Sequence, residues 1–415
     1  MRVCIHRGCK QIGGSCVEVE KDGQRLLVDI GLPLDAEGES SKYLPEIEGL
    51  DGKDESLLGI LISHPHIDHF GLLEDVSPVV PIGIGAAARR ILKAAAPFLP
   101  NKKDLSFNGW ELNSEKCIRI GPFTVTPYLV DHSAYDSYAF KIESGGKSLF
   151  YSGDFRAHGR KAALFERLIS DPPKNIDVLL MEGSSLGRIS EFQQFPTEDE
   201  IEDRLTGILS QTAGLGLVHT SGQNIDRIVS VFRASKKTGR KLVLDLYTAS
   251  ILHATKNRNI PQSYWSDVAL YVPQAQRIKI KKNRWFELLE RHSSGRIYID
   301  EIKEDSNKFT LLFRPLHGSD LEKAECLEGA AYIYSQWEGY WEQGSYDFVK
   351  KWLCRNSIPK YSVHTSGHAS LENLKEMASA INPASLVPIH SFMPERYLEL
   401  FDNVHVKQDN EWWNV

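Results

Sequence analysis

The chain has few features that would place it in or across a membrane. No stretch of about 18 uncharged apolar residues occurs in its 415 residues, and the first residues contain no long apolar segment. The first absence excludes a conventional membrane-spanning helix, and the second argues against a secretion signal. We therefore expect a cytoplasmic protein without a membrane partner.

Cysteine pairs of the C-x-x-C type are also missing. Such pairs are typical of zinc knuckles and of redox motifs, and regular cysteine spacing is typical of disulfide frameworks. The sequence predicts reduced thiols at all six cysteines, which are Cys4, Cys9, Cys16, Cys117, Cys326 and Cys354.

An excess of positive charge is absent as well. Lysine and arginine total 49 against 55 aspartates and glutamates, which gives a formal net charge of −6. This balance excludes the global basic field of many nucleic-acid-binding proteins, although a local basic cleft is still compatible with it. The apolar fraction of 41% and the length indicate a folded protein of two or three domains.

What the chain does contain is a dense group of metal-binding side chains. His64, His66, Asp68 and His69 form an H-x-H-x-D-H cluster directly after the apolar run 57–62, which predicts a strand. This spacing can serve two adjacent metal ions, His64 and His66 on one and Asp68 and His69 on the other. A chance group of histidines on a surface loop is the alternative, but the pattern favours a metal-dependent hydrolase.

A further histidine follows a later strand. His132 comes after the predicted strand 124–130, where its imidazole could complete a tripodal site with His64 and His66. Alone, one such histidine is more often a hydrogen-bonded surface residue. Strands at 117–120, 123–129, 137–142 and 148–151 and a helix at 86–96 predict a layered α/β sandwich.

The H-x-H-x-D-H arrangement resembles the signature of the metallo-β-lactamase superfamily. The segments 179–187, 364–370 and 386–391 resemble three motifs of its β-CASP nuclease branch, which includes ribonuclease J, and the resemblance spans nearly the whole chain. It implies an αββα sandwich, with residues 1–182 as the first part of the metallo-β-lactamase domain, 183–355 as an inserted α/β β-CASP domain and 356–415 as the return segment.

The resemblance also implies particular ligands and catalytic groups. It places His64, His66 and His132 on one metal ion, Asp68, His69 and His390 on the second, and Asp154 between them, with Zn²⁺ expected and Mn²⁺ as the alternative. It gives Asp29 a supporting role beside the metal loop, for which a simple turn-forming aspartate is the alternative. Besides Asp68, the expected catalytic residues are Glu182 and His368, because a carboxylate that holds an imidazole can tune it to donate a proton.

Residues that would hold the substrate are predicted at two places. The backbone N–H groups of Ser366 and Gly367 can approach a phosphate oxygen, and Ser221, Asn224 and Arg227 lie at the start of a predicted helix, 225–238, where a phosphodiester can bind. A simple helix cap is the alternative for the second place. The basic stretch 277–285 either lines a nucleic-acid groove or is a solvated face.

Together these features predict a two-metal phosphodiesterase that cleaves single-stranded nucleic acid, most of all RNA, in an exo- or endonucleolytic manner. In the predicted mechanism a metal-bound hydroxide attacks phosphorus. The alternatives are a hydrolase of a small ester, thioester or lactam on the same metal core, a nuclease acting on DNA, and a metal-free nucleic-acid-binding scaffold. The sequence leaves a homo-oligomer open.

Overall fold

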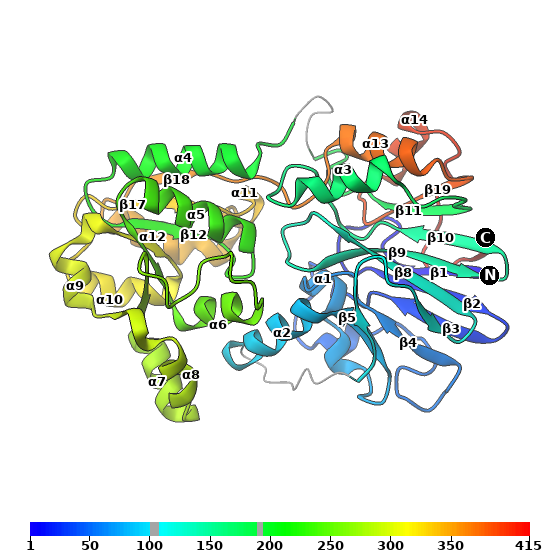
Figure 1. The fold of residues 1–415 in the computed structure, drawn as a ribbon, viewed down its shortest axis with the longest axis horizontal. Coiled ribbons are helices and arrows are strands. Elements are labelled where there is room, and N and C mark those ends of the chain that lie inside the picture. The colour runs from blue at the N-terminus through cyan, green and yellow to red at the C-terminus, as the bar shows by residue number, and fades with distance from the viewer. Residues whose placement is uncertain (100–107, 189–193) are drawn as a thin grey trace. The chain divides into compact units, whose positions relative to one another are not determined.

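The computed structural model describes residues 1–99, 108–188 and 194–415, and the chain divides into two compact units (Figure 1). Unit 1 comprises residues 1–195 and 367–415, and unit 2 comprises residues 196–366. The domain boundaries predicted at 182/183 and 355/356 stay predictions.

The described residues of unit 1 form two β-sheets. In spatial order the first sheet contains β20 (Trp412–Asn414), β1 (Arg2–Arg7), β2 (Cys16–Lys21), β3 (Gln24–Val28), β4 (Leu57–Leu61), β5 (Ile82–Gly85) and β6 (Glu111–Leu112). The second contains β19 (Ser385–Ile389), β11 (Val178–Glu182), β10 (Lys147–Tyr151), β9 (Ser137–Ser144), β8 (Phe123–Val130) and β7 (Ile118–Ile120). The helices of the unit are α1 (Ile67–Phe70), α2 (Ala86–Ala95), α3 (Ala162–Ser170), α13 (Leu371–Ile381) and α14 (Tyr397–Leu400).

The two sheets pack face to face between layers of helices. Val19 of β2 and Phe140 of β9 belong to one buried cluster between the sheets. Leu92 of α2 packs in a cluster on the outer face of the first sheet, and Phe165 of α3 and Met377 of α13 pack in a cluster on the outer face of the second. This order of layers confirms the predicted αββα sandwich.

A tight turn of two residues joins β2 to β3. Asp22 and Gly23 both have positive φ angles, 54° and 77°, and Lys21 pairs with Gln24 across the turn. Asp-Gly adopts such a two-residue turn readily, and its twist matches that of the flanking strands.

Unit 2 is built on one parallel sheet. In spatial order its described strands are β15 (Arg296–Ile297), β14 (Val268–Tyr271), β13 (Lys241–Leu244), β16 (Phe309–Leu312), β12 (Gly216–His219), β17 (Ala331–Tyr334) and β18 (Lys360–Ser362). Its helices are α4 (Glu198–Gln211), α5 (Ile225–Lys237), α6 (Leu246–Ala254), α7 (Gln274–Asn283), α8 (Phe286–Arg291), α9 (Ile299–Glu304), α10 (Gly318–Lys323), α11 (Glu338–Trp341) and α12 (Asp347–Arg355).

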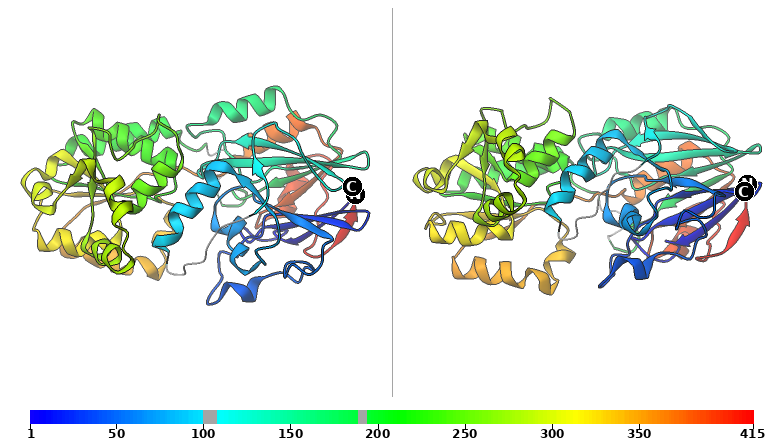
Figure 2. Two further views of the ribbon diagram at one scale, coloured as in Figure 1. Left: turned by 60° about the horizontal axis from the view of Figure 1, so that its bottom comes forward. Right: turned by 90° about the horizontal axis from the view of Figure 1, so that it is seen from below.

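Every strand pair in this sheet is parallel, so helices must cover both of its faces. Figure 2 shows α4 and α5, in green, and α12, in orange, on opposite sides of the sheet. The inserted segment therefore has the α/β fold predicted for it. None of the helices in the described part of the chain has the length and apolar composition that crossing a bilayer requires.

Candidate metal centre

The metal-binding side chains of unit 1 lie where strands end. In the second sheet β10, β11 and β19 are parallel neighbours, and Glu182 pairs with Ile389 in the register. Asp154 follows β10, Glu182 ends β11 and His390 follows β19. Since carboxyl ends of neighbouring parallel strands meet at one edge, residues more than two hundred positions apart become neighbours.

The predicted ligands converge into three overlapping groups. In each group the ligand atoms all lie within 4.8 Å of one another. The groups are His64, His66 and His132; Asp68, His69, Asp154 and His390; and Asp154, Glu182 and His368.

Asp154 lies at the centre of this arrangement. Its Oδ2 atom is 3.7 Å from Nε2 of His64, 3.2 Å from Nε2 of His69 and 3.7 Å from Nε2 of His390. One carboxylate oxygen thus faces a histidine of the first group and two histidines of the second. A bridging ligand between two cations needs this position.

Each of four histidines is held through its Nδ1 atom, so that Nε2 faces the centre. Nδ1 of His64 lies 3.0 Å from Ser63 Oγ, and Nδ1 of His132 donates to the Gly367 carbonyl at 2.5 Å. The other two contacts are His69 Nδ1 to Asp29 Oδ2 at 2.7 Å and His390 Nδ1 to Ser15 Oγ at 2.8 Å. Such partners orient the ring of a metal-binding histidine and fix its tautomer.

The fifth histidine, His66, faces the same space through Nδ1 instead of Nε2. Nδ1 of His66 lies 3.1 Å from Nε2 of His132. Because Nδ1 of His132 carries the proton that Gly367 accepts, the lone pair on its Nε2 faces His66. Two imidazole nitrogens that converge in this way are suited to one cation between the rings of the first group.

The chemistry of these residues fits metal ions. Among the described residues, the buried Nε2 atoms of His64, His69 and His390 have no hydrogen-bond partner. Leaving a buried polar atom without a partner costs free energy, so three at one place indicate a ligand. Imidazoles and carboxylates in this proportion are a donor set for Zn²⁺ or Mn²⁺.

Burial keeps most of these imidazoles neutral. Burial, reinforced by the neighbouring histidines, holds the pKa of both His64 and His132 well below the usual value. The same cause lowers the pKa of His66 to about 4 and lowers that of His390. Neutral imidazole is the form that binds a metal.

His69 is the exception. Burial opposes its protonation, but the carboxylates of Asp154, Asp29 and Asp68 outweigh burial and raise the pKa of His69 well above the usual value. Burial likewise opposes ionisation of Asp154, yet His390 and His69 hold the pKa of Asp154 well below its usual range. Negative charge therefore concentrates around one imidazole, an environment that favours a bound cation.

Glu182 and His368 form a pair beside the third group. Nδ1 of His368 lies 3.1 Å from Glu182 Oε2, and the backbone N–H of Phe155 donates to Glu182 Oε1 at 3.0 Å. Burial lowers the pKa of His368, but Glu182 and Asp154 outweigh it and raise that pKa to about 9. Glu182 is buried, whereas the His368 side chain is 25% exposed. The imidazole is therefore held by a buried carboxylate and is still partly accessible.

Three supporting residues were less visible in the sequence. Asp29 accepts hydrogen bonds from the Ser63 backbone N–H, the His69 ring and the Tyr151 hydroxyl, so it fixes the metal loop in several ways. Ser15, which holds His390, was not predicted. Asp-x-Gly hinted at Asp29, but nothing in the spacing of Ser15 or Tyr151 distinguishes them from other core residues.

The residues predicted to hold substrate in unit 2 have mixed surroundings. Asn224 accepts from the Arg227 backbone N–H and so caps α5, which is the alternative stated for it. The Arg227 side chain is fully buried and contacts Glu198 and Ser335, which argues against direct contact with a substrate. Ser221 is exposed, and its predicted role stays a prediction.

Ser366 and Gly367 lie on either side of the boundary between the two units. Gly367 lies against the metal centre, because a Cβ atom there would come 2.7 Å from Ser133 Oγ and 3.2 Å from His132 Cε1. The missing side chain thus lets its carbonyl reach His132. The substrate contacts predicted for both residues stay predictions.

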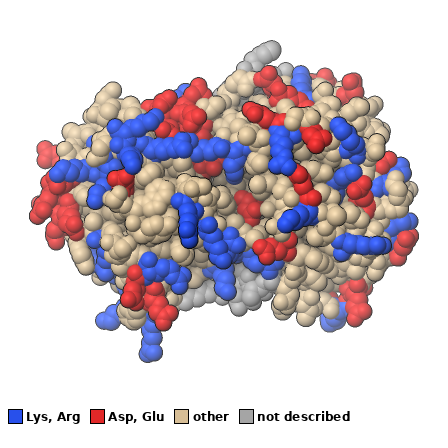
Figure 3. Space-filling view, in the orientation of Figure 1, with Lys and Arg blue, Asp and Glu red and all other residues tan. Residues whose placement is uncertain are grey.

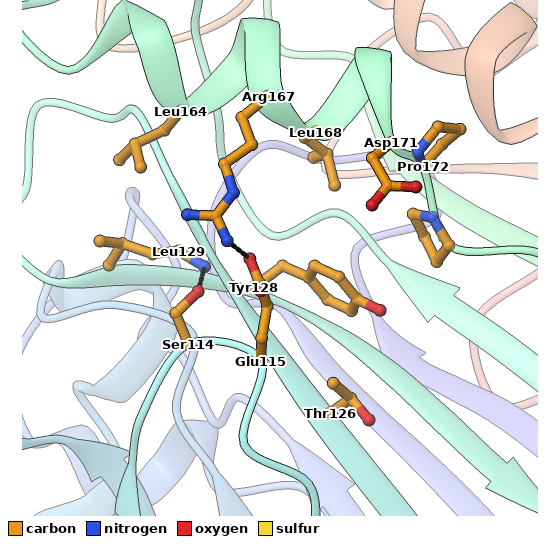
Figure 4. Close-up of a pocket in the computed structure, with 11 residues that line it drawn as sticks. Ser114, Glu115, Thr126, Tyr128, Leu129, Leu164, Arg167, Leu168, Asp171 and Pro172 are labelled. Carbon is orange, nitrogen blue, oxygen red and sulfur yellow. Dashed lines mark hydrogen bonds and ion pairs between the residues drawn. The ribbon is translucent and has the colours of Figure 1, made fainter.

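A separate cavity of about 300 Å³ lies between β8 and α3 of unit 1 (Figure 4). Arg167 extends into it and pairs with Glu115, and Tyr128 and Asp171 line it. It contains none of the predicted site residues, and its arginine is already neutralised by a carboxylate. The cavity therefore gives no argument for a second active site.

Comparisons with known proteins agree with this geometry. Residues 25–191 match a family described as the beta-lactamase superfamily domain. Ribonuclease J of Mycoplasma genitalium is 22% identical, covering 92% of this chain and 66% of that protein, and ribonuclease J of Sinorhizobium meliloti is 24% identical, covering 84% and 60%. A protein of unknown function from Enterococcus faecalis has a solved structure with a TM-score of 0.79 at 22% identity, covering 99% of both chains.

The chain spans at most about two thirds of the length of the ribonuclease J proteins described above, 66% and 60%. The similarity nevertheless extends over both units of this chain. Together with the αββα sandwich and the convergent histidines, it confirms the resemblance predicted from the sequence. Residues 25–191 thus match a beta-lactamase superfamily domain, the fold is an αββα sandwich with an inserted α/β domain, and the chain is similar to the ribonuclease J proteins.

Proposed function

We propose that this protein is a two-metal phosphodiesterase that cleaves single-stranded nucleic acid, and that RNA is its substrate in preference to DNA. The observation that carries the proposal is the position of Asp154 Oδ2, within 3.7 Å of histidines from both metal-binding groups. The names of the relatives, ribonuclease J, support RNA as the substrate.

In this proposal His64, His66 and His132 would hold one divalent cation, Asp68, His69 and His390 would hold a second, and Asp154 would serve both. Zn²⁺ is the expected ion and Mn²⁺ the alternative. When bound, the two ions supply Lewis acidity and lower the pKa of water at the site. The chain's own contribution is to fix the ligands, since Asp29 and the Gly367 carbonyl each orient one of the imidazoles.

His368 is the proposed proton donor. Glu182 accepts from Nδ1 of His368, so the second ring nitrogen can donate to an oxygen of the substrate phosphate or leaving group. Glu182 is itself held by backbone N–H groups of Phe155 and Ser184, which keeps the pair in one orientation. Glu182 is therefore a positioning residue, and its effect passes through His368.

Ser366 and Gly367 are proposed to contact a phosphate oxygen through their backbone, and Ser221 to contact a further part of the strand. The capping role of Asn224 and the buried ion pair of Arg227 make these two residues supports of the loop rather than contacts.

The test is a cleavage time course with metal-loaded protein on internally labelled single-stranded RNA and matched DNA. An Asp68→Asn variant is the control, because it removes a ligand charge with little change in shape. We expect RNA to be cleaved by the wild type and not by the variant, and the product sizes to separate exo- from endonucleolytic cleavage.

Two results would contradict the proposal. If metal-loaded protein leaves both polymers intact but hydrolyses small esters or lactams, the substrate class is wrong while the hydrolase class stands. If D68N cleaves RNA as fast as the wild type, the activity does not come from this site.

A further inference from the structure

Unit 2 carries a basic projection that has no part in the proposed metal centre. It consists of α7 and α8, residues 274–291, and Figure 1 shows these helices extending from the rest of the unit. Residues 274–284 include five cations and no acidic residue: Arg277, Lys279, Lys281, Lys282 and Arg284. We call residues 274–291 the basic arm.

The arm is attached firmly at its base. The Gln276 side chain donates to Asp245 Oδ2 at 2.8 Å and accepts from the Leu246 backbone N–H at 3.1 Å, and Ile280 is buried. Gln276 and Ile280 are one helical turn apart, so α7 rests on the unit by one face. The arm is therefore an ordered element, and its remaining faces point away from the attachment.

The cations lie on the remaining faces. Arg277 and Lys281 are one helical turn apart, which places them on one side of α7, and Arg284 follows as the left-handed cap of the helix. In the described part of the chain, no carboxylate forms an ion pair with Lys279, Lys281, Lys282 or Arg284, whereas Arg277 lies 3.9 Å from Asp320. In Figure 3 the lowest part of the projection consists of lysine or arginine, and acidic side chains lie directly above it. Concentrated, unneutralised cations attract a polyanion.

The apolar side chains of the arm favour nucleic acid over a membrane surface. Ile278 is 57% exposed, but Ile280, two positions on, is buried at the attachment, so α7 has no continuous exposed apolar face of the kind that enters a bilayer. Phe286, at the start of α8, is 56% exposed. An exposed aromatic ring beside cations is the combination that binds single strands through stacking and phosphate contacts.

We propose that the basic arm is a second, non-catalytic binding surface for single-stranded nucleic acid, in which Lys281, Lys282 and Arg284 contact phosphates and Phe286 stacks on a base. This inference rests on the proposed function, since it takes the same polymer as ligand. It adds affinity for the strand and leaves the metal centre unchanged.

The test measures binding of a fluorescent single-stranded RNA to the full-length protein, in chelator to prevent cleavage, over a range of salt concentrations. The test variant is K281Q/K282Q/R284Q. The control is R233Q/K236Q/K237Q, which removes three exposed cations from α5 and changes the net charge equally. For single strands the slope of log affinity against log salt changes by about 0.7 for each phosphate contact, so the arm variant should lose about 2 from the slope.

We expect the control to keep the wild-type slope and F286A to bind more weakly with an unchanged slope. Hydrolysis of a small chromogenic phosphodiester by the metal-loaded arm variant should equal that of the wild type, because this reaction reports on the metal centre alone.

The inference is overturned if the arm variant keeps the wild-type slope, or if the control loses as much slope as the arm variant. It is also overturned if the arm variant loses binding to anionic phosphatidylserine vesicles but not to RNA. If the wild type hydrolyses the small phosphodiester and binds RNA, and the arm variant binds RNA with the same affinity and salt dependence, only the arm inference fails. If the wild type neither binds nor cleaves RNA, the proposed function fails with it.

Discussion

Both units place charged side chains at the carboxyl ends of parallel strands, yet the two groups of charges differ in how they are satisfied. In unit 1 the Nε2 atoms of His64, His69 and His390 surround Asp154 without forming hydrogen bonds. In unit 2 Arg314 pairs with Asp245 at 3.2 Å, and Arg227 pairs with Glu198 at 3.0 Å. The side chains at the carboxyl edge of the sheet can thus bind a ligand in unit 1, whereas those in unit 2 are occupied by internal ion pairs.

The comparison shows that the strand order brings charged side chains together at the carboxyl edge of each sheet. Whether these side chains pair with one another decides whether they can bind a ligand. Arg227 can form bonds to the Glu198 carboxylate and to Ser335, so little of its hydrogen-bonding capacity is left. In unit 1 the Nδ1 atoms of His64, His69 and His390 are occupied, and their Nε2 atoms have no hydrogen-bond partner among the described residues.

The largest expected effect comes from removing the central carboxylate. Asp154→Asn replaces the one charge shared by both metal-binding groups, so we expect bound metal to fall below two ions per chain and cleavage to slow by about 1,000-fold or more. Metal analysis and RNA cleavage rates check this. Asp177→Asn, which alters an aspartate bonded to Ser148 and Lys147, should keep both. Two ions per chain in D154N would contradict the bridging role.

Breaking the ion pair between Arg227 and Glu198 should lower the free energy of unfolding and leave metal binding unchanged. Arg227→Met leaves the Glu198 carboxylate buried without its cation, which costs about 3–5 kcal/mol. Urea unfolding followed by tryptophan fluorescence checks this, because five of the eight tryptophans lie in unit 2. The double variant with Glu198→Leu should recover part of the loss. If R227M unfolds at the wild-type urea concentration, the pair does not stabilise the unit.

A smaller effect is expected when a residue that supports a metal ligand is replaced. Asp29→Asn keeps the shape and tolerates the positive φ of 60° at this position, but it weakens the acceptor for His69. We expect metal affinity to fall about 10- to 100-fold in chelator competition, as for other partners of ligating histidines. Tyr151→Phe, which removes one donor to Asp29, should lower affinity less. Equal affinities in all three proteins would show that the bracing is unimportant.

The smallest expected effect is on the pH dependence of stability, through the ion pair of His6 and Glu18 in unit 1. Nε2 of His6 lies 2.6 Å from Glu18; burial opposes protonation of His6, but contacts with Cys4 and Glu18 outweigh it and raise the pKa of His6 to about 10. A raised pKa stabilises the fold fully below pH 6.5, and the contribution is lost as pH rises towards 10. We expect His6→Gln to cost about 2 kcal/mol more at pH 6 than at pH 10 in urea unfolding. A difference that does not change with pH would contradict this.

The secondary structure and the ligands could be predicted from local patterns. The predicted strand 123–129 and helix 86–96 correspond to β8 and α2, because alternating burial and strong helix formers act within a short window. The predicted ligands converge because each follows a strand, and a strand end is visible in the sequence as an apolar run followed by polar residues.

Partnerships between distant residues could not be predicted in the same way. Arg227 was expected to reach a substrate, but its direction depends on Glu198 of the preceding helix, and no local pattern reveals which carboxylate an arginine meets. The hydroxyl of Ser15 contacts His390 across 375 positions, and no local pattern around Ser15 reveals such a distant partner. The stretch 277–285 was read as basic, but its position on a projecting helix depends on the anchoring of Gln276.

The strand β19 also has a consequence for how the protein is made. β19 and His390 follow unit 2 in the chain, although β19 belongs to the same sheet as β10 and β11, whose ends position Asp154 and Glu182. A ribosome that has translated through residue 366 has produced the first histidine group in full, but neither His368 nor His390. Since domains fold as they emerge during synthesis, the second metal-binding group is completed only after the whole of unit 2 has been translated.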